Sequence, residues 1–320
     1  MVKNSGHFRP TRHELKDGIC SDPDTTVCGP FHAPQEGRPL SVEIVPLSDA
    51  IGAEITGVDL TRPMSDAVLE TVTGAFLAHK IILFRGQNLE PEDQTRFARR
   101  FGDIQTIRSA KHILGDNEEL MHVSNREVDG KPGVLPEGEM QFHNDQCYYE
   151  CPARATLLYA IEIPGAGGHT LFLNTVKAYA ALGPDLKQRL APLEVFNIYD
   201  YDINPTIKGD GIRADAPQFV HPVVIRHPDT GEPALFVNRL MSDHITGTDR
   251  HESDALLTGL FDHMEQPQFI YEHRWTEGDL LMWDNYASQH ARTDFDPEQP
   301  RILRRVAVQG TRPAAAELAA

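Results

Sequence analysis

A histidine and a carboxylate stand two residues apart in the stretch Phe142-His143-Asn144-Asp145. Side chains alternate between the two faces of a β-strand, so on a strand both groups would project from the same face. They can supply two ligands to a metal ion, and His290, far downstream, is the candidate for the third. Two histidines and one carboxylate on one face of a metal leave its opposite positions open, as in the facial triad of non-heme Fe(II) sites. The sequence therefore predicts a catalytic metal site at His143, Asp145 and His290.

A second His-x-Asp sequence, His227-Pro228-Asp229, runs on into Thr230-Gly231. Pro-Asp-Thr-Gly is typical of a β-turn, so we interpret this copy as a surface hairpin tip. The first copy is followed by a long apolar strand, which favours a rigid site there. Spacing alone leaves a loop salt bridge between His143 and Asp145 as the alternative.

The chain has 320 residues, of which 40% are hydrophobic and 24% charged, so it is long enough for one large domain with a substantial core. Its 47 acidic and 30 basic residues give a net charge of −17. Such a surface repels nucleic acids and anionic membranes. The expected partner is therefore a small-molecule substrate, and neither nucleic acid nor a membrane is expected. The oligomeric state stays open, a homo-oligomer included.

No segment of the sequence predicts export or insertion into a membrane. Residues 1–13 lack the apolar region of a signal peptide, and apolar runs such as 81–84 are too short to span a bilayer. The four cysteines are too few for a disulfide framework in a chain of this size. Cys147 and Cys151 lack a second pair that would complete a zinc site, so we expect buried or merely adjacent thiols. A cytoplasmic location is the resulting expectation.

The folded domain is expected to span residues 41–320. Residues 1–40 are rich in Pro, Gly, Asp and His without periodicity, which indicates a flexible N-terminal extension. Ser65 and Pro91 are typical of helix starts, and helical patterns recur near 175–182 and 252–264. Apolar or alternating runs predict strands at 41–46, 79–85, 154–163, 170–173, 218–226, 234–238, 268–274, 279–283 and 301–309. Many predicted strands and few predicted helices together indicate a mainly β fold with flanking helices, as in a sandwich or open barrel.

Residues 103–140 form a polar stretch that Gly and Pro interrupt. Long connections without regular structure often cover or bind a substrate. Because this stretch directly precedes His143, we expect it to be a lid or a substrate loop.

The strand at 301–309 carries three arginines. By the period of two, Arg301, Leu303 and Arg305 share one face, and Arg304 lies on the other. Burying an unpaired arginine is costly, so an inward arginine should meet a carboxylate. For Arg304 we predict exposure to solvent.

Five ordered motifs resemble the taurine dioxygenase family of Fe(II)/2-oxoglutarate-dependent oxygenases, which also includes 2,4-dichlorophenoxyacetate dioxygenase. The motifs are Gly52-Ala53-Glu54-Ile55-Thr56-Gly57-Val58-Asp59-Leu60, His143-x-Asp145, Gly167-Gly168-His169-Thr170, Trp283-Asp284-Asn285 before His290, and the pair Arg301 and Arg305. His169 replaces the aspartate of the family's Gly-Gly-Asp-Thr. The resemblance covers residues 41–312 and favours the metal site over a loop salt bridge.

The resemblance implies a double-stranded β-helix, or jelly roll, that forms a 2-oxoglutarate-dependent dioxygenase domain over 41–320. It implies that His143, Asp145 and His290 bind Fe(II), that Arg301 holds the distal carboxylate of 2-oxoglutarate, and that Thr170 hydrogen-bonds this cosubstrate. A guanidinium suits that carboxylate because it is always charged and can bind in a bidentate manner. The implied reaction consumes O2, releases succinate and CO2, and oxidises a substrate C–H bond, usually by hydroxylation.

The residues around the substrate depart from the taurine enzymes. Gln105 and Ile107 stand where those enzymes have a histidine for the sulfonate, and Glu139 replaces an asparagine. We therefore expect another substrate, with Glu139 and Tyr148 as candidate contacts. Arg305 is expected to meet an acidic group of the substrate, which makes a small or medium organic acid the expected substrate. An internal pair of Arg305 with Glu139 or Asp103 is the alternative.

Four other functions are alternatives for this group of residues. A halogenase of this superfamily would replace the carboxylate by Gly or Ala, and Asp145 argues against that. A zinc hydrolase would not need Arg301. A non-catalytic 2-oxoglutarate sensor would keep the same ligands, and a desaturase would use the same scaffold for another oxidative outcome.

Overall fold

The computed structural model describes residues 41–107, 117–131, 133, 135, 138–199 and 216–317. Contacts between Cα atoms group Leu40–Ala320 into one compact unit, which is the part described below. The predicted N-terminal extension, and 108–116 of the predicted lid, lie outside the described residues. None of the helices that the structure describes has the length and apolar character needed to cross a membrane.

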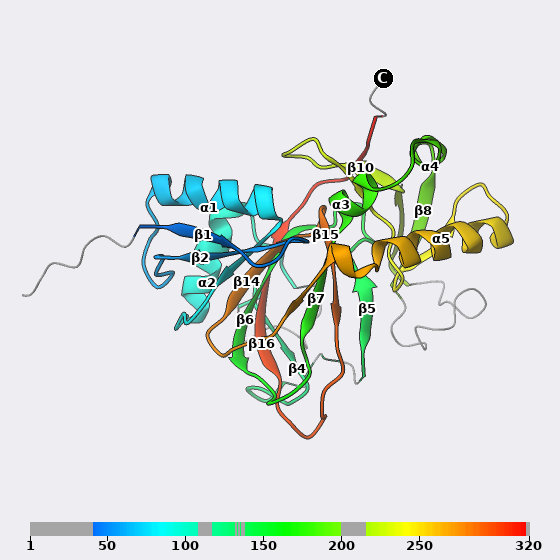
Figure 1. Ribbon diagram of the computed structural model, residues 1–320. Coiled ribbons are helices and arrows are strands. Elements are labelled where there is room, and N and C mark those ends of the chain that lie inside the picture. The colour runs from blue at the N-terminus through cyan, green and yellow to red at the C-terminus, as the bar shows by residue number, and fades with distance from the viewer. Residues whose placement is uncertain are drawn as a thin grey trace, which may run out of the picture. The chain divides into compact units, whose positions relative to one another are not determined.

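Most of the regular structure is β, with few helices (Figure 1). A seven-stranded sheet has the order β1 (Glu43–Pro46), β2 (Ala53–Thr56), β3 (Ile81–Phe84), β14 (Leu280–Asp284), β6 (Ala153–Glu162), β16 (Ile302–Gln309) and β4 (Met121–Ser124). A four-stranded sheet has the order β13 (Ile270–His273), β7 (Thr170–Asn174), β15 (Ser288–Arg292) and β5 (Met140–His143). All pairs are antiparallel except β2 with β3.

Two smaller sheets and five α-helices complete the described elements. The small sheets are β12 (Ser242–Ile245), β8 (Glu194–Ile198) and β9 (Gln218–Pro222), and β11 (Pro233–Leu235), β10 (Val224–Arg226) and β17 (Ala314–Ala315). The helices are α1 (Asp66–His79), α2 (Pro91–Ala98), α3 (Thr175–Ala180), α4 (Pro184–Leu190) and α5 (Arg250–Met264), with 3-10 turns η1 (Arg99–Phe101) and η3 (Pro267–Phe269).

The alternation of side chains along β3 explains how the layers pack. Ile82 and Phe84 join the core cluster that also contains Val72 and Phe76 of α1. Ile81 and Leu83 point the other way, into a cluster with Phe172 of β7. One face of the large sheet is thus covered by α1 and α2, and the other faces the four-stranded sheet.

The predicted helix starts are confirmed. The Ser65 side chain accepts a hydrogen bond from the backbone N–H of Val68 at the start of α1. Pro91 begins α2, where a missing N–H costs nothing. The sequence analysis did not predict strands β2, β4, β8, β12, β15 and β17 or helix α4, all of which are short.

Two predictions about exposed segments are corrected. The predicted lid is not irregular throughout, because β4 lies inside it and pairs with β16. Arg304 is only 6% exposed, whereas exposure to solvent was predicted. Its Nε donates to Gln94 Oε1 at 2.8 Å and its Nη2 to the carbonyl of Leu89 at 2.6 Å. The face of β16 that carries Arg304 is covered by α2, and strand periodicity alone could not reveal that cover.

Candidate active site

The three predicted ligands meet at one point. His143 ends β5, His290 lies in β15, and the two residues are direct partners across the antiparallel pair. Asp145 lies two residues past the end of β5, in a turn. The sequence analysis placed both His143 and Asp145 on a strand, and only His143 is there. One ligand atom from each of the three residues lies within 4.8 Å of those from the other two.

Asn285 fixes the position of Asp145 because strand geometry does not. The backbone N–H of Asp145 donates to Asn285 Oδ1 at 2.7 Å, and Asn285 Nδ2 donates to the Asp145 carbonyl at 2.8 Å. The same Nδ2 reaches the carbonyl of Ala153 at 2.8 Å. The Trp-Asp-Asn motif therefore provides the side chain that holds the turn carrying the carboxylate.

The carboxylate of Asp145 has two polar partners. Thr156 Oγ1 donates to Oδ2 at 2.5 Å, and Arg305 Nη2 lies 3.1 Å from the same oxygen. Burial alone would raise the pKa of Asp145, but Arg305, the two histidines and the Thr156 hydrogen bond bring this pKa well below its usual range. The prediction that Arg305, if paired internally, would meet Glu139 or Asp103 is corrected, because its partner is Asp145.

Both imidazoles suit a metal. Burial lowers the pKa of His143, and it lowers that of His290 to about 3, so both rings are neutral at pH 7. His143 Nδ1 lies 2.9 Å from the carbonyl of Gln141, which places its proton there and leaves a lone pair on Nε2. Among the described residues, the buried Nδ1 of His290 has no hydrogen-bond partner. Two neutral imidazoles and one carboxylate form a donor set that fits Fe(II).

A buried cation lies near this metal site. Arg301 is 2% exposed, and its Nε donates to the carbonyl of Gly168 at 3.0 Å. Burial and the nearby charge of Arg292 lower the pKa of Arg301 to about 9, so it stays charged at pH 7. No carboxylate of the described residues forms an ion pair with it. An anionic ligand would relieve the cost of burying this charge.

The Gly-Gly-His-Thr motif shapes the same region. Gly168 has a φ of +64°, and a Cβ there would stand 3.1 Å from Arg301 Cδ, so glycine allows the close approach. Thr170 is buried, and its Oγ1 accepts a hydrogen bond from Trp275 Nε1 at 2.9 Å. The hydrogen of the Thr170 hydroxyl is therefore free to be donated to a ligand.

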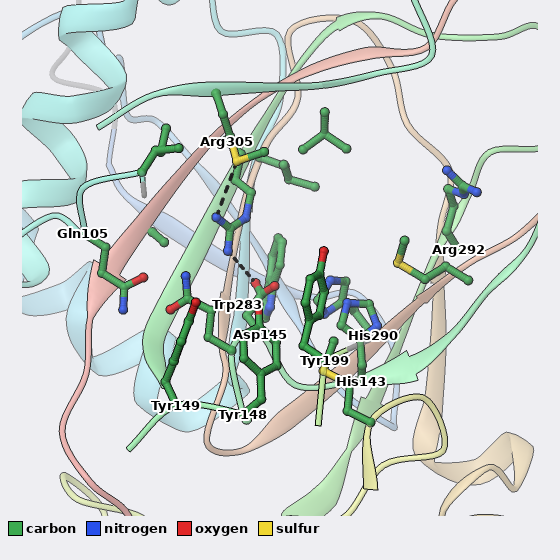
Figure 2. Close-up of a pocket in the computed structure, with 18 of the residues that line it drawn as sticks. Gln105, His143, Asp145, Tyr148, Tyr149, Tyr199, Trp283, His290, Arg292 and Arg305 are labelled. Atoms are coloured by element: carbon green, nitrogen blue, oxygen red, sulfur yellow. Dashed lines mark hydrogen bonds and ion pairs between the residues drawn. The ribbon is translucent and has the colours of Figure 1, made fainter. Parts of the chain in front are cut away.

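These groups line one cavity of about 750 Å³ (Figure 2). The lining includes the triad, Thr170, Arg301, Arg305, Tyr148, Gln105 and Ile107. Glu139 is exposed and does not line the cavity, so the structure does not bring that predicted residue to the site. Sequence reasoning missed Tyr199, Met121, Val123 and Leu158, which line it together with Tyr149.

The cysteines take no part in a metal cluster within the described residues. Cys147 is fully buried, and its Sγ accepts from Asn238 Nδ2 at 3.4 Å. Burial raises the pKa of this thiol to about 12, so it stays protonated. Cys151 is exposed and lines the cavity, and both thiols are free.

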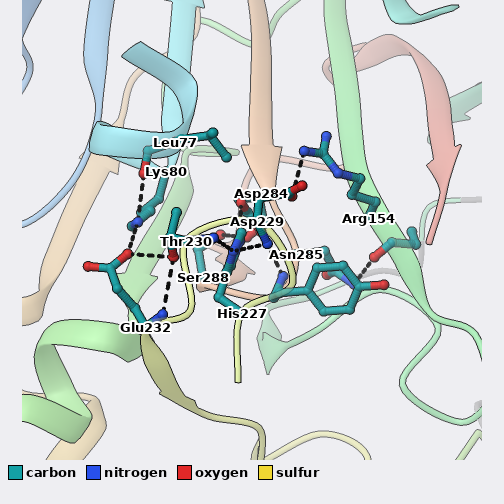
Figure 3. A network of polar contacts seen from close by, with 12 residues as sticks. Leu77, Lys80, Arg154, His227, Asp229, Thr230, Glu232, Asp284, Asn285 and Ser288 are labelled. Atoms are coloured by element: carbon teal, nitrogen blue, oxygen red, sulfur yellow. Dashed lines mark hydrogen bonds and ion pairs between the residues drawn. The ribbon is translucent and has the colours of Figure 1, made fainter. Parts of the chain in front are cut away.

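The second His-x-Asp sequence forms a turn, as predicted, but its histidine is not on the surface (Figure 3). His227 and Asp284 are each 1% exposed, and His227 Nε2 donates to Asp284 Oδ2 at 2.7 Å. Asp229 faces outward, where it pairs with Arg154 at 2.7 Å. The turn folds back onto the large sheet and buries the ring, which the turn residues do not reveal.

A mostly β fold with two histidines and a carboxylate at one cavity defines a candidate non-heme metal enzyme. The family model "Taurine catabolism dioxygenase TauD, TfdA family" matches residues 43–307. The chain is 31% identical over 288 residues to a pentalenolactone F synthase of Streptomyces avermitilis, covering 84% of this chain and 94% of that one. It is 32% identical over 279 residues to an (S)-phenoxypropionate/alpha-ketoglutarate-dioxygenase of Sphingobium herbicidovorans, covering 82% and 92%.

A solved structure supports the same assignment. The crystal structure of AAD-2 in complex with Mn(II) and N-oxalylglycine has a TM-score of 0.72 and 27% identity, covering 86% of this chain and all of that one. The chain therefore belongs to the taurine catabolism dioxygenase TauD, TfdA family. It is a 2-oxoglutarate-dependent dioxygenase whose cofactors are Fe(II), 2-oxoglutarate and O2.

Proposed function

We propose that this dioxygenase hydroxylates a C–H bond of an organic acid that has a substantial apolar part. The observation that carries the proposal is the presence of two separate arginines, Arg301 and Arg305, in one cavity with the triad. One cation matches the distal carboxylate of 2-oxoglutarate. The other, Arg305, lies 3.1 Å from Asp145 Oδ2 and would turn to an acidic group of the substrate when one is bound.

His143, Asp145 and His290 would hold the iron, and Arg301 and Thr170 the cosubstrate. Arg301 would bind the distal carboxylate through its guanidinium, and the Thr170 hydroxyl would donate its free hydrogen. When bound, the iron and 2-oxoglutarate supply the oxidising power that turns O2 and a substrate C–H bond into a hydroxylated product, succinate and CO2. The protein's own groups orient both acids and exclude water from the buried end of the cavity.

The cavity favours a substrate larger than taurine. Tyr148, Tyr149 and Tyr199 form a partly buried aromatic cluster, with ring centroids 4.7 and 4.6 Å from Tyr148 to its two neighbours. Met121, Val123 and Leu158 add apolar surface, and the volume of about 750 Å³ exceeds what 2-oxoglutarate alone needs. The relative named for (S)-phenoxypropionate likewise acts on an acid with an apolar part.

We infer that the two facing sheets form a double-stranded β-helix, the jelly roll that the resemblance implies. On this interpretation residues 41–320 are one dioxygenase domain and residues 1–40 a flexible extension. The partner of the site is a small molecule, with neither nucleic acid nor a membrane involved, and a homo-oligomer is compatible with it.

A substrate screen tests the proposal. Succinate release is followed under air, with Fe(II) and 2-oxoglutarate, across organic acids, their amides and matched amines. We expect the acids to stimulate release, and Arg305→Gln to raise the KM for the best acid about 10- to 150-fold, as for a hydrogen bond to a charged group worth about 1.5–3 kcal/mol.

The control variant is Arg239→Gln, which removes an arginine that pairs with Glu265 and Asp262 away from the cavity. It should leave that KM unchanged. Uncoupled 2-oxoglutarate consumption by Arg305→Gln should persist. A neutral or cationic compound as the best substrate would contradict the acid proposal, and no succinate from any condition would contradict the dioxygenase activity.

A further inference from the structure

The two oxygens of the Asp145 carboxylate stand in different surroundings. Oδ2 accepts the hydroxyl of Thr156 at 2.5 Å and lies 3.1 Å from Arg305 Nη2. Within the described part of the chain, no hydrogen bond or ion pair reaches Oδ1. Only one oxygen of the carboxylate is therefore fastened to the protein.

We propose that Thr156 is a positioning residue that keeps Asp145 a monodentate metal ligand. By holding Oδ2, the hydroxyl would leave Oδ1 as the oxygen that can bind a metal. A carboxylate that bound through both oxygens would occupy a second coordination position. The facial triad works because its opposite positions stay open for the cosubstrate and O2, so this restraint protects an open position. The inference rests on the proposed function of the site.

Thr156 suits this role better than Arg305 because it is rigid. It is fully buried in the middle of β6, opposite Trp283 on one neighbouring strand and Ala307 on the other. A β-branched side chain on a central strand has a strongly restricted χ1. The hydrogen bond to a carboxylate is also charge-assisted, and 2.5 Å lies at the short end of the range for such bonds.

Arg305 is less suited to hold the carboxylate permanently. Its side chain is 16% exposed, it has long rotatable stems, and it is the group that the proposed function assigns to the substrate. Arg305 Nη2 lies 3.1 Å from Asp145 Oδ2 and 3.5 Å from Thr156 Oγ1, so the arginine and the hydroxyl contact the same carboxylate oxygen side by side. If Arg305 turns to a substrate acid, Thr156 still holds Oδ2. The threonine thus separates the binding of substrate from the orientation of the metal ligand.

A hydroxyl at this position needs a reason. The neighbours of Thr156 along β6 are Ala155 and Leu157, both fully buried and apolar, and valine has the same shape as threonine. A buried hydroxyl is costly unless it is hydrogen-bonded. The Asp145 carboxylate accepts that hydrogen bond, and a valine at this position has no hydroxyl to donate.

The test is the affinity for Mn(II), which is measured by titration with detection of free Mn(II) by electron paramagnetic resonance. We expect Thr156→Val to bind Mn(II) about 10- to 100-fold more weakly than the parent, as for the loss of other groups that orient metal ligands. Thr156→Ser keeps the hydroxyl and should restore the affinity to within about threefold of the parent.

Thr175→Val is the matched control. Thr175 is also fully buried, but its Oγ1 has no hydrogen-bond partner in the part of the chain that the structure describes, and it does not line the cavity. The same chemical change there should leave Mn(II) affinity unchanged. Thermal unfolding of the metal-free proteins shows whether each variant is folded when its affinity is measured.

The outcomes separate this inference from the proposed function. If the parent binds Mn(II) and Thr156→Val binds it equally well, the positioning role is wrong and the metal site stands. If Thr156→Ser is as weak as Thr156→Val, the hydroxyl is not what matters and the inference is also wrong. If the parent itself binds no Mn(II), both the inference and the proposed function are overturned.

Discussion

The side chains of the two His-x-Asp sequences in this chain are arranged in opposite ways. At His143-Asn144-Asp145 both side chains turn toward a cavity and meet His290, and their ligand atoms are left free for a metal. At His227-Pro228-Asp229 the two side chains part. The imidazole turns inward to Asp284, and the carboxylate turns outward to Arg154. The difference teaches that the residue pattern permits a metal site and that the groups brought in from distant strands decide it.

The second site is closed because every polar atom of its ring is used. His227 Nε2 donates to Asp284, and His227 Nδ1 accepts from the backbone N–H groups of Asp229 and Thr230 at 3.2 and 3.1 Å. Figure 3 shows that this network continues to Thr230, Glu232 and Lys80. No lone pair remains for a metal. The arginines and a third histidine likewise differ in whether their polar atoms are already used by hydrogen bonds within the protein.

The largest effect is expected where the two carboxylates are compared. Asp145→Ala should abolish the formation of succinate from 2-oxoglutarate, because it removes the only charged ligand of the triad. Asp229→Ala should leave activity unchanged and cost at most about 1 kcal/mol of stability, since it breaks one partly exposed ion pair. Succinate assays and urea unfolding measure the two effects. Substantial turnover by Asp145→Ala would rule out the ligand assignment.

A smaller effect is expected from the two buried arginines. Arg301→Ala should weaken the binding of 2-oxoglutarate by about 2–5 kcal/mol, because it removes the cation proposed for the distal carboxylate. Arg304→Ala removes another buried arginine, whose hydrogen bonds go to Gln94 and Leu89. It should lower the melting temperature and leave 2-oxoglutarate affinity intact. Titration calorimetry with 2-oxoglutarate in the presence of Mn(II) distinguishes the two variants. Equal losses of affinity would show that Arg301 has no special role in binding 2-oxoglutarate.

The smallest effect concerns a histidine with no role in the site. His221 is fully buried and bonds the carbonyl of Tyr149 through Nε2 at 2.9 Å, and burial lowers its pKa from 6.5 to about 4. Between these two values the unfolded chain binds a proton that the folded chain does not, so stability falls as the pH falls. The slope for one proton is about 1.4 kcal/mol per pH unit.

His221→Phe should remove that slope. Between pH 6.5 and pH 5 the parent should lose about 1.6 kcal/mol more stability than the variant, as measured by urea unfolding at each pH. Parallel curves for the two proteins would show that His221 does not titrate in this way.

The sequence was sufficient to predict that the side chains of His143, Asp145 and His290 would meet at one point. The types of the ligand residues and the order of the motifs can be read from the sequence. Neither requires knowledge of the conformation of the turn after β5. The sequence was also sufficient for most of the longer strands and helices, whose apolar periodicity reflects the two core clusters on either face of β3.

What could not be predicted depends on contacts between distant segments. Thr156 looks like any residue of an apolar strand, and its role appears only when Asp145 is placed beside it. The alternative partners Glu139 and Asp103 were wrong for Arg305, because Asp145, in the turn after β5, is the carboxylate that lies beside it. Arg304 and His227 were expected at the surface, since neither strand period nor turn chemistry shows which face another element will cover.

The pairing of His143 with His290 has a consequence for the stability of the edge of the four-stranded sheet. Among the strands that the structure describes, β5 is the outermost of its sheet and its strand partner is β15, and each of the two strands supplies one histidine to the site. A metal held by both would join the edge strand to its neighbour by a second kind of bond. Bound iron would then stabilise the folded protein in addition to its part in the reaction. Protein synthesised under iron limitation would carry a looser edge strand, the kind of segment where proteases and aggregation begin.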